Sequence, residues 1–141
     1  MKLATEEELV NYGRELGARL AASEAGDGAA RVVELTGDVG AGKTTLTRGI
    51  AEGLGVAEAV TSPSFTISKR YAFPGGVLVH YDFYRLPDPG IMREEIAEAL
   101  ADPQNVIVVE WGGSVADLLP EEHLRISISL LDDGGREIIA N

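Results

Sequence analysis

Apolar and small residues recur at the spacing of an amphipathic helix near the start of the chain. Thr5 and Glu8 have the form of a capping box, in which the threonine accepts from a free backbone N–H and the glutamate reaches back. The positions that follow at intervals of three or four residues are Leu9, Tyr12, Gly13, Leu16 and Leu20. This pattern predicts a helix over residues 6–22 with one face packed on a core.

The next segments alternate between strand and helix patterns. Residues 32–35 predict a short strand, residues 37–42 form a glycine-rich turn, and residues 43–54 predict a helix that glycines stop. A further helix is predicted over residues 91–101. The continuous apolar run at 106–109, rich in β-branched side chains, predicts a strand buried on both faces.

Two hairpin patterns complete the chain. Residues 65–71 and 77–81 predict two strands joined by the turn Pro74-Gly75-Gly76. Residues 124–130 and 137–140 alternate around a second turn. Strands that alternate with helices early and form hairpins later indicate an α/β sandwich with a mixed sheet.

Composition and charge exclude several classes of protein. The formal net charge of −11 repels phosphate backbones, so we expect no unaided binding of nucleic acid, and a bound anion needs a local device. The absence of cysteine excludes disulfides, thiolate zinc sites and cysteine nucleophiles. The first residues are acidic where a signal peptide is basic, and no apolar run could span a membrane. We expect a cytoplasmic protein with no membrane partner.

Residues 37–44, with the sequence GDVGAGKT, match the phosphate-binding pattern G-x-x-x-x-G-K-[ST]. Glycines let the backbone turn several N–H groups toward one phosphate, and the helix that follows adds its positive end. Lys43 is expected to reach the β- and γ-phosphates, and the hydroxyl of Thr44 to bind Mg²⁺. The motif predicts a P-loop NTPase-like three-layer sandwich, with residues 1–141 as a single P-loop ATPase domain.

Two carboxylates directly follow predicted strands. Glu110 follows the run at 106–109, and Asp82 follows the strand at 77–81. Open α/β sheets bind ligands at the carboxyl ends of their strands, and a P-loop protein needs an acidic residue there for its Mg²⁺ shell. We expect Glu110 to hold Mg²⁺ and Asp82 to act at the metal or the γ-phosphate. His80 is more typical of a packed, hydrogen-bonded side chain than of a catalyst, and His123 is expected at the surface.

The nucleotide is predicted to be ATP. The N-K-x-D segment with which GTPases read guanine does not occur, and Arg85 stands where a GTPase switch needs a glycine three residues after Asp82. A small-molecule kinase is an alternative, although the chain has little room for a lid and a substrate-binding insert. A non-catalytic sensor, in which ATP binding only orders residues 61–65, is another.

Four segments together resemble the bacterial TsaE family, also called YjeE. They are residues 37–45, SPSF at 62–65, HYDFYR at 80–85, and Glu110-Trp111, and Gly-Arg-Glu at 135–137 fits as well. The resemblance covers nearly the whole chain. It implies an ATPase required for threonylcarbamoyladenosine (t6A) modification of tRNAs that read ANN codons. In that family the ATPase acts as a switch on a TsaD–TsaB complex, so this subunit would meet tRNA only through its partners.

The resemblance also implies a set of site residues. Thr44 and Glu110 would hold Mg²⁺, Lys43 and Asp82 would support catalysis with Glu110, and Arg136 would lie near the adenine. The implied nucleotide-binding residues are Glu6, Gly37, Gly40, Ala41, Gly42, Lys43, Thr44, Thr45 and Arg136. Since no general base is visible, we expect slow hydrolysis by the isolated chain.

Overall fold

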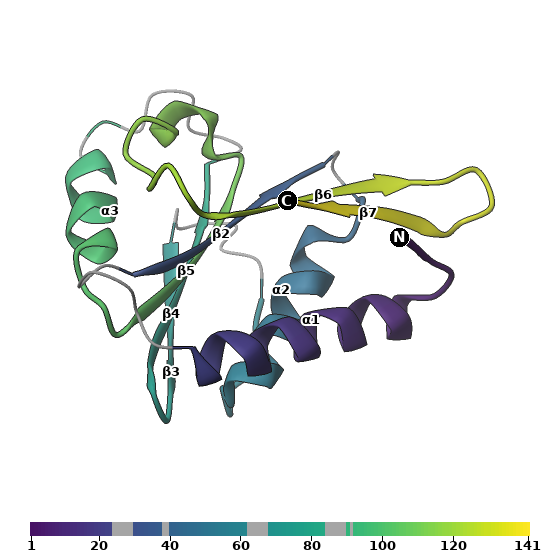
Figure 1. The fold of residues 1–141 in the computed structure, drawn as a ribbon, viewed down its shortest axis with the longest axis horizontal. Coiled ribbons are helices and arrows are strands. Elements are labelled where there is room, and N and C mark those ends of the chain that lie inside the picture. The colour runs from purple at the N-terminus through teal and green to yellow at the C-terminus, as the bar shows by residue number, and fades with distance from the viewer. Residues whose placement is uncertain (24–29, 38–39, 62–67, 84–89, 91) are drawn as a thin grey trace.

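The computed structural model describes residues 1–23, 30–37, 40–61, 68–83, 90 and 92–141 (Figure 1). Its strands are β1 (Lys2–Leu3), β2 (Arg31–Thr36), β3 (Ser68–Phe73), β4 (Gly76–Asp82), β5 (Asn105–Glu110), β6 (Leu124–Leu130) and β7 (Arg136–Ala140). These strands form one sheet in the order β1-β7-β6-β2-β5-β4-β3. Strands β6, β2, β5 and β4 are parallel, and β3, β7 and β1 pair antiparallel at the two edges. The sheet is therefore mixed, as the sequence predicts.

The helices are α1 (Glu6–Ala22), α2 (Lys43–Leu54) and α3 (Met92–Leu100), with a 3₁₀ turn η2 (Gly112–Val115) after β5. Thr5 caps α1 by accepting from the backbone N–H of Glu8 at 3.1 Å. The Glu8 carboxylate reaches back to the backbone N–H of Ala4, one residue before the cap. Within the described part of the chain, no helix combines the length and the apolar character needed to cross a membrane.

Alternating side chains give the sheet two buried faces. Val33, Leu35 and Val108 belong to a core that α1 and α2 cover, whereas Ile107 and Val109 belong to a second core that includes residues of α3. Figure 1 shows α3 and the pair of α1 and α2 on different sides of the strands. The order helix, sheet, helix confirms the predicted three-layer α/β fold.

The predicted elements differ from the structure mainly at their ends. α1 and β6 have the predicted bounds. β3 continues to Phe73 rather than Tyr71, because its antiparallel pairing with β4 persists to the turn; residues 65–67 lie outside the described residues. The sequence pattern missed β1, since two residues are too few to show alternation, yet Lys2 and Leu3 pair with β7.

Glycines bring the backbones of α1 and α2 into direct contact. A Cβ atom at Gly17 of α1 would lie 2.2 Å from the backbone oxygen of Ile50, and one at Gly53 of α2 would lie 2.2 Å from that of Arg14. Such distances leave no space for even a methyl group. The position of α2 is therefore fixed by α1 as well as by the sheet.

We expect Gly17→Ala to lower the free energy of unfolding by about 2–3 kcal/mol, because a new methyl group must push the two helices apart. The higher helix propensity of alanine offsets only part of this loss. Urea unfolding followed by circular dichroism measures the change. Gly113→Ala is a suitable control, since a Cβ there would meet nothing within 4 Å. Equal losses in the two variants would contradict the proposed packing constraint.

Tyr81 is buried in the second core. Its ring stacks on Phe83 with 5.7 Å between the ring centres, and its hydroxyl has no hydrogen-bond partner among the described residues. Burial, with a smaller contribution from the charge of Glu95, raises the pKa of Tyr81 to about 12. An unfolded tyrosine has a pKa of about 10, so the unfolded chain binds fewer protons between pH 10 and 12. Stability must therefore fall as the pH rises through that window.

Tyr81→Phe should remove this contribution to alkaline unfolding. At pH 8 we expect the variant to be at least as stable as the native chain, because the lost hydroxyl has no partner among the described residues. Between pH 9 and 11.5, the urea midpoint should fall more steeply for the native chain than for the variant. Parallel pH profiles for the two proteins would show that Tyr81 ionises normally.

Candidate functional site

The carboxyl ends of three neighbouring parallel strands bring the two predicted carboxylates together. Leu35 of β2 is in register with Glu110 of β5, which is in register with Asp82 of β4. Residues in register on adjacent strands lie about 5 Å apart and point to the same face of the sheet. Because Leu35 belongs to the core under α1 and α2, Glu110 and Asp82 face the side of the sheet that carries α2.

The glycine-rich segment connects β2 to α2, as predicted, with residues 38 and 39 outside the described part. Gly40 and Gly42 have φ angles of 84° and 112°, in the left-handed region that favours glycine. Gly42 is the N-cap of α2 and has no side chain with which to cap the helix, and the first turn contains no acidic residue. The first-turn N–H groups and the positive end of α2 thus lie where an anion can bind without competition from an acidic side chain of that turn.

Lys43 is almost completely buried, at 6% exposed. Its ammonium group donates to the backbone oxygen of Gly37 and lies 4.2 Å from the centre of the Trp111 ring. Trp111 is the one non-glycine residue of the described ranges with a positive φ, 57°. This conformation turns the chain directly after Glu110. The end of β5 therefore carries the Glu110 carboxylate and, next to it in the chain, the ring that contacts Lys43.

Glu110 has a buried partner that the sequence did not identify. Glu110 is 2% exposed, and its Oε2 atom is hydrogen-bonded to Nε2 of His80, which is fully buried. His80 is in register with Val108, two residues before Glu110, so the pair is diagonal across β4 and β5. The prediction of a packed, hydrogen-bonded histidine agrees with this contact.

Arg136 links the C-terminal strand to the glycine-rich segment. Its Nε atom donates to the backbone oxygen of Ala41 at 2.6 Å, and Nη1 donates to that of Gly134 at 2.7 Å. Thr44 and Thr45 are half-buried in the first turn of α2, and Glu6 is exposed in the first turn of α1. The structure thus places Arg136, from the far end of the chain, beside the loop.

The donor atoms at this edge fit Mg²⁺ bound together with phosphates. Among the residues that the structure describes, no group of three or more His, Asp or Glu could hold a metal ion by itself. Mg²⁺ commonly takes one or two protein oxygens and completes its shell with phosphate oxygens and water. The Glu110 carboxylate and the Thr44 hydroxyl are oxygen donors of this kind, and Lys43, adjacent to Thr44, contacts Trp111, adjacent to Glu110.

His123 corrects a prediction. The sequence placed it at the surface, but its side chain is only 4% exposed and pairs through Nε2 with Oε1 of Glu34 at 2.9 Å. Its Nδ1 lies 2.6 Å from the backbone oxygen of Pro120. Glu34 lies between Val33 and Leu35 on β2 and so points to the opposite face of the sheet from Glu110. This second His–Glu pair is therefore separate from the candidate site.

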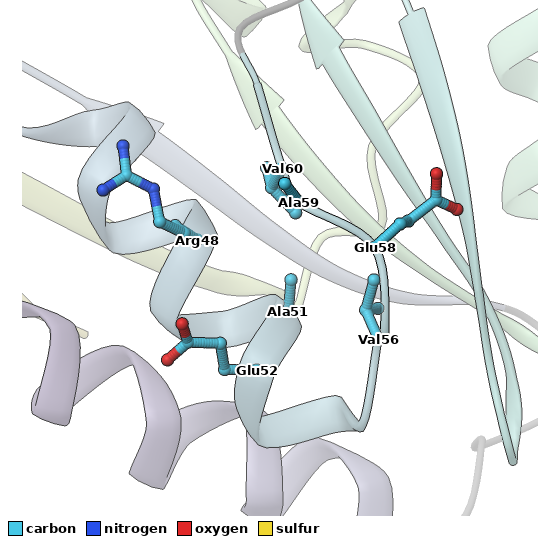
Figure 2. Close-up of a pocket in the computed structure, with 7 residues that line it drawn as sticks. All are labelled: Arg48, Ala51, Glu52, Val56, Glu58, Ala59 and Val60. Atoms are coloured by element: carbon cyan, nitrogen blue, oxygen red, sulfur yellow. The ribbon is translucent and has the colours of Figure 1, made fainter.

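A small hollow of about 160 Å³ lies farther along α2 (Figure 2). It is lined by Arg48, Ala51, Glu52, Val56, Glu58, Ala59 and Val60. Its residues begin more than one helical turn beyond Lys43, so it does not belong to the candidate site. The polar segments predicted at 62–65 and 84–85 lie outside the described residues.

Comparison with known proteins identifies relatives along most of the chain. The family model described as "Threonylcarbamoyl adenosine biosynthesis protein TsaE" matches residues 3–138. A tRNA threonylcarbamoyladenosine biosynthesis protein TsaE from Streptomyces coelicolor is 48% identical over 118 residues, which are 82% of this chain and 77% of that protein. The protein of the same name from Haemophilus influenzae is 37% identical over 77% of this chain and 70% of its own length.

A solved structure has the same fold. The crystal structure of YdiB from Bacillus subtilis matches with a TM-score of 0.74 and 36% sequence identity, over 98% of this chain and 80% of that one. The family match and the structural match each span nearly the whole chain. The chain belongs to the TsaE family.

Proposed function

We propose that this chain is a Mg²⁺-dependent ATPase that acts as an ATP-driven switch on a TsaD–TsaB complex during synthesis of t6A in tRNA. The observation that carries the proposal is that Lys43, in the first turn of α2, contacts Trp111, the residue after Glu110, while Asp82 is the register partner of Glu110 on the neighbouring strand. The names of the relatives supply the pathway, since they are called threonylcarbamoyladenosine biosynthesis proteins.

In this proposal the phosphates occupy the N-terminal end of α2. Lys43 exchanges its contacts with Gly37 and Trp111 for oxygens of the β- and γ-phosphates, which its buried position lets it reach with little loss of hydration. Thr44 and Glu110 would hold Mg²⁺, which would supply positive charge to offset the negative charge of the phosphates. The buried surroundings of Lys43 and Glu110 strengthen both electrostatic interactions.

The remaining site residues have positioning roles. Asp82, one strand farther from the loop than Glu110, orients the attacking water or the water shell of the metal. Arg136 holds the loop through the Ala41 oxygen and lies on the side proposed for the adenine, with Glu6 as a further contact of the nucleotide. Catalysis then depends on positioning and electrostatics, so we expect turnover by the isolated chain to be slow.

The acidic charge of the chain supports the proposed division of labour with its partners. A net charge of −11 disfavours direct contact with the tRNA backbone. In the proposal, TsaD and TsaB contact the tRNA, and this subunit contributes the nucleotide-dependent step. Neither step involves a membrane.

Lys43→Ala should weaken binding of ATP with Mg²⁺ by about 10- to 100-fold, because each charge-assisted hydrogen bond to a phosphate is lost. The single tryptophan of the chain reports binding directly, since its ring lies 4.2 Å from the lysine Nζ. We expect ATP to change the Trp111 emission of the native chain. Lys2→Ala, which removes an exposed lysine paired with Asp133, is the control. A folded Lys43→Ala chain with native ATP affinity would contradict the proposal.

Phosphate release should be slow for the chain alone and should increase when the TsaD–TsaB pair is added. Asp82→Asn should bind ATP nearly as the native chain does but hydrolyse it about 100-fold more slowly, because only the reaction step loses a properly placed charge. Equal losses in binding and hydrolysis would contradict the role of Asp82.

Two outcomes would favour the alternative functions. Phosphate transferred to a metabolite would indicate a kinase. ATP binding without turnover, even with the partners present, would indicate a nucleotide sensor.

A further inference from the structure

The buried contact between His80 and Glu110 has a defined direction. A carboxylate that serves as a Mg²⁺ ligand is ionised and can only accept hydrogen bonds, so in that state the Nε2 atom of His80 donates to Oε2 of Glu110. A neutral imidazole that donates from Nε2 carries a bare lone pair on Nδ1. That Nδ1 atom is buried and has no hydrogen-bond partner within the described part of the chain. The imidazole therefore makes its one hydrogen bond to the carboxylate.

The second histidine shows what a fully satisfied histidine looks like in the same protein. Both ring nitrogens of His123 have partners, Glu34 at 2.9 Å and the backbone oxygen of Pro120 at 2.6 Å. A histidine kept for packing alone is expected to satisfy both nitrogens in this way, because an unpaired buried polar atom destabilises the fold. Among the described residues, His80 has no such second partner, so the hydrogen bond to Glu110 is the contact through which we expect it to act.

The contact restricts the Glu110 side chain. One carboxylate oxygen is held by His80, and the backbone oxygen of Glu110 accepts from the N–H of Phe83 at 3.1 Å. The other carboxylate oxygen, Oε1, is then presented in one orientation. Mg²⁺ demands nearly ideal octahedral geometry, so a ligand that is already oriented binds it with less reorganisation.

We infer that His80 is a positioning residue that orients the Glu110 carboxylate so that its second oxygen can bind Mg²⁺. This inference rests on the proposed function, in which Glu110 holds the Mg²⁺ of bound ATP. His80 itself touches neither the metal nor the nucleotide. It acts in the way that hydrogen-bonded partners of metal ligands do in other proteins, where their loss weakens metal binding by 10- to 100-fold.

A titration of Mg²⁺ against ATP binding tests the inference without measuring turnover. The affinity for ATP is measured first in EDTA and then at increasing Mg²⁺ concentrations. His80→Asn replaces the ring with a shorter amide that cannot reach Glu110, whereas the amide nitrogen of His80→Gln can take the place of Nε2. For His80→Asn we expect the affinity for ATP in EDTA to be unchanged. We expect the Mg²⁺ concentration that gives half of the maximal increase in ATP affinity to rise about 10- to 100-fold. For His80→Gln we expect nearly native behaviour.

His123→Asn is the matched control, because it breaks the second, part-buried His–Glu pair on the opposite face of the sheet. It should lower thermal stability and leave the Mg²⁺ requirement unchanged. If His80→Asn needs no more Mg²⁺ than the native chain, the inference is wrong. If His123→Asn raises the Mg²⁺ concentration needed for half-maximal tightening of ATP binding as much as His80→Asn does, the inference is also wrong. The effect would then follow from lost stability. If Mg²⁺ does not tighten ATP binding to the native chain, the proposed function itself fails.

Discussion

The close backbone contact between α1 and α2 determines where the glycine-rich segment before α2 lies. The glycines of the two helices allow an approach that any larger side chain would prevent. Because α2 begins at Lys43, its placement against α1 and the sheet also sets the position of the lysine. The same packing brings Leu9 of α1 against Gly42, where a Cβ atom would lie only 2.7 Å from the leucine. The packing of α1 on α2 thus also holds Gly42, the residue directly before Lys43, in place.

The site itself consists of charged groups that the fold has buried and supplied with partners. Removing an ion from water is costly unless hydrogen bonds or opposite charges replace the lost hydration. Lys43 has a carbonyl oxygen and an indole ring, and Glu110 has an imidazole. These partners come from the ends of β2, β4 and β5, which the parallel sheet brings to one edge. The arrangement favours a ligand that carries both negative phosphates and a cation. The phosphates can pair with the Lys43 ammonium, and the cation can pair with the Glu110 carboxylate.

The sequence predicts the parts of the site that follow from local pattern and strand direction. The loop at 37–44 is a contiguous motif, and Glu110 and Asp82 were found because each directly follows an apolar strand. The partners of these residues depend on register and strand order, which no local pattern encodes. His80 meets Glu110 only because β4 and β5 pair with one particular offset. Arg136 reaches Ala41, 95 residues away, and His123 reaches Glu34 only because β6 lies beside β2.

In the proposed function an acidic chain binds a triphosphate, so the binding site must overcome the repulsion that the chain's own negative charge exerts on the ligand. The net charge of −11 repels ATP at long range, but at about 0.1 M salt the repulsion is screened beyond about 10 Å. Attraction then depends on groups within contact distance: the N–H groups and positive end of α2, the Lys43 ammonium and the Arg136 guanidinium. In such a chain a Mg²⁺ ion does more than complete the chemistry, because it also reduces the negative charge brought to an acidic surface. The orientation of Glu110, the carboxylate that would hold this ion, therefore matters more here than it would in a basic protein.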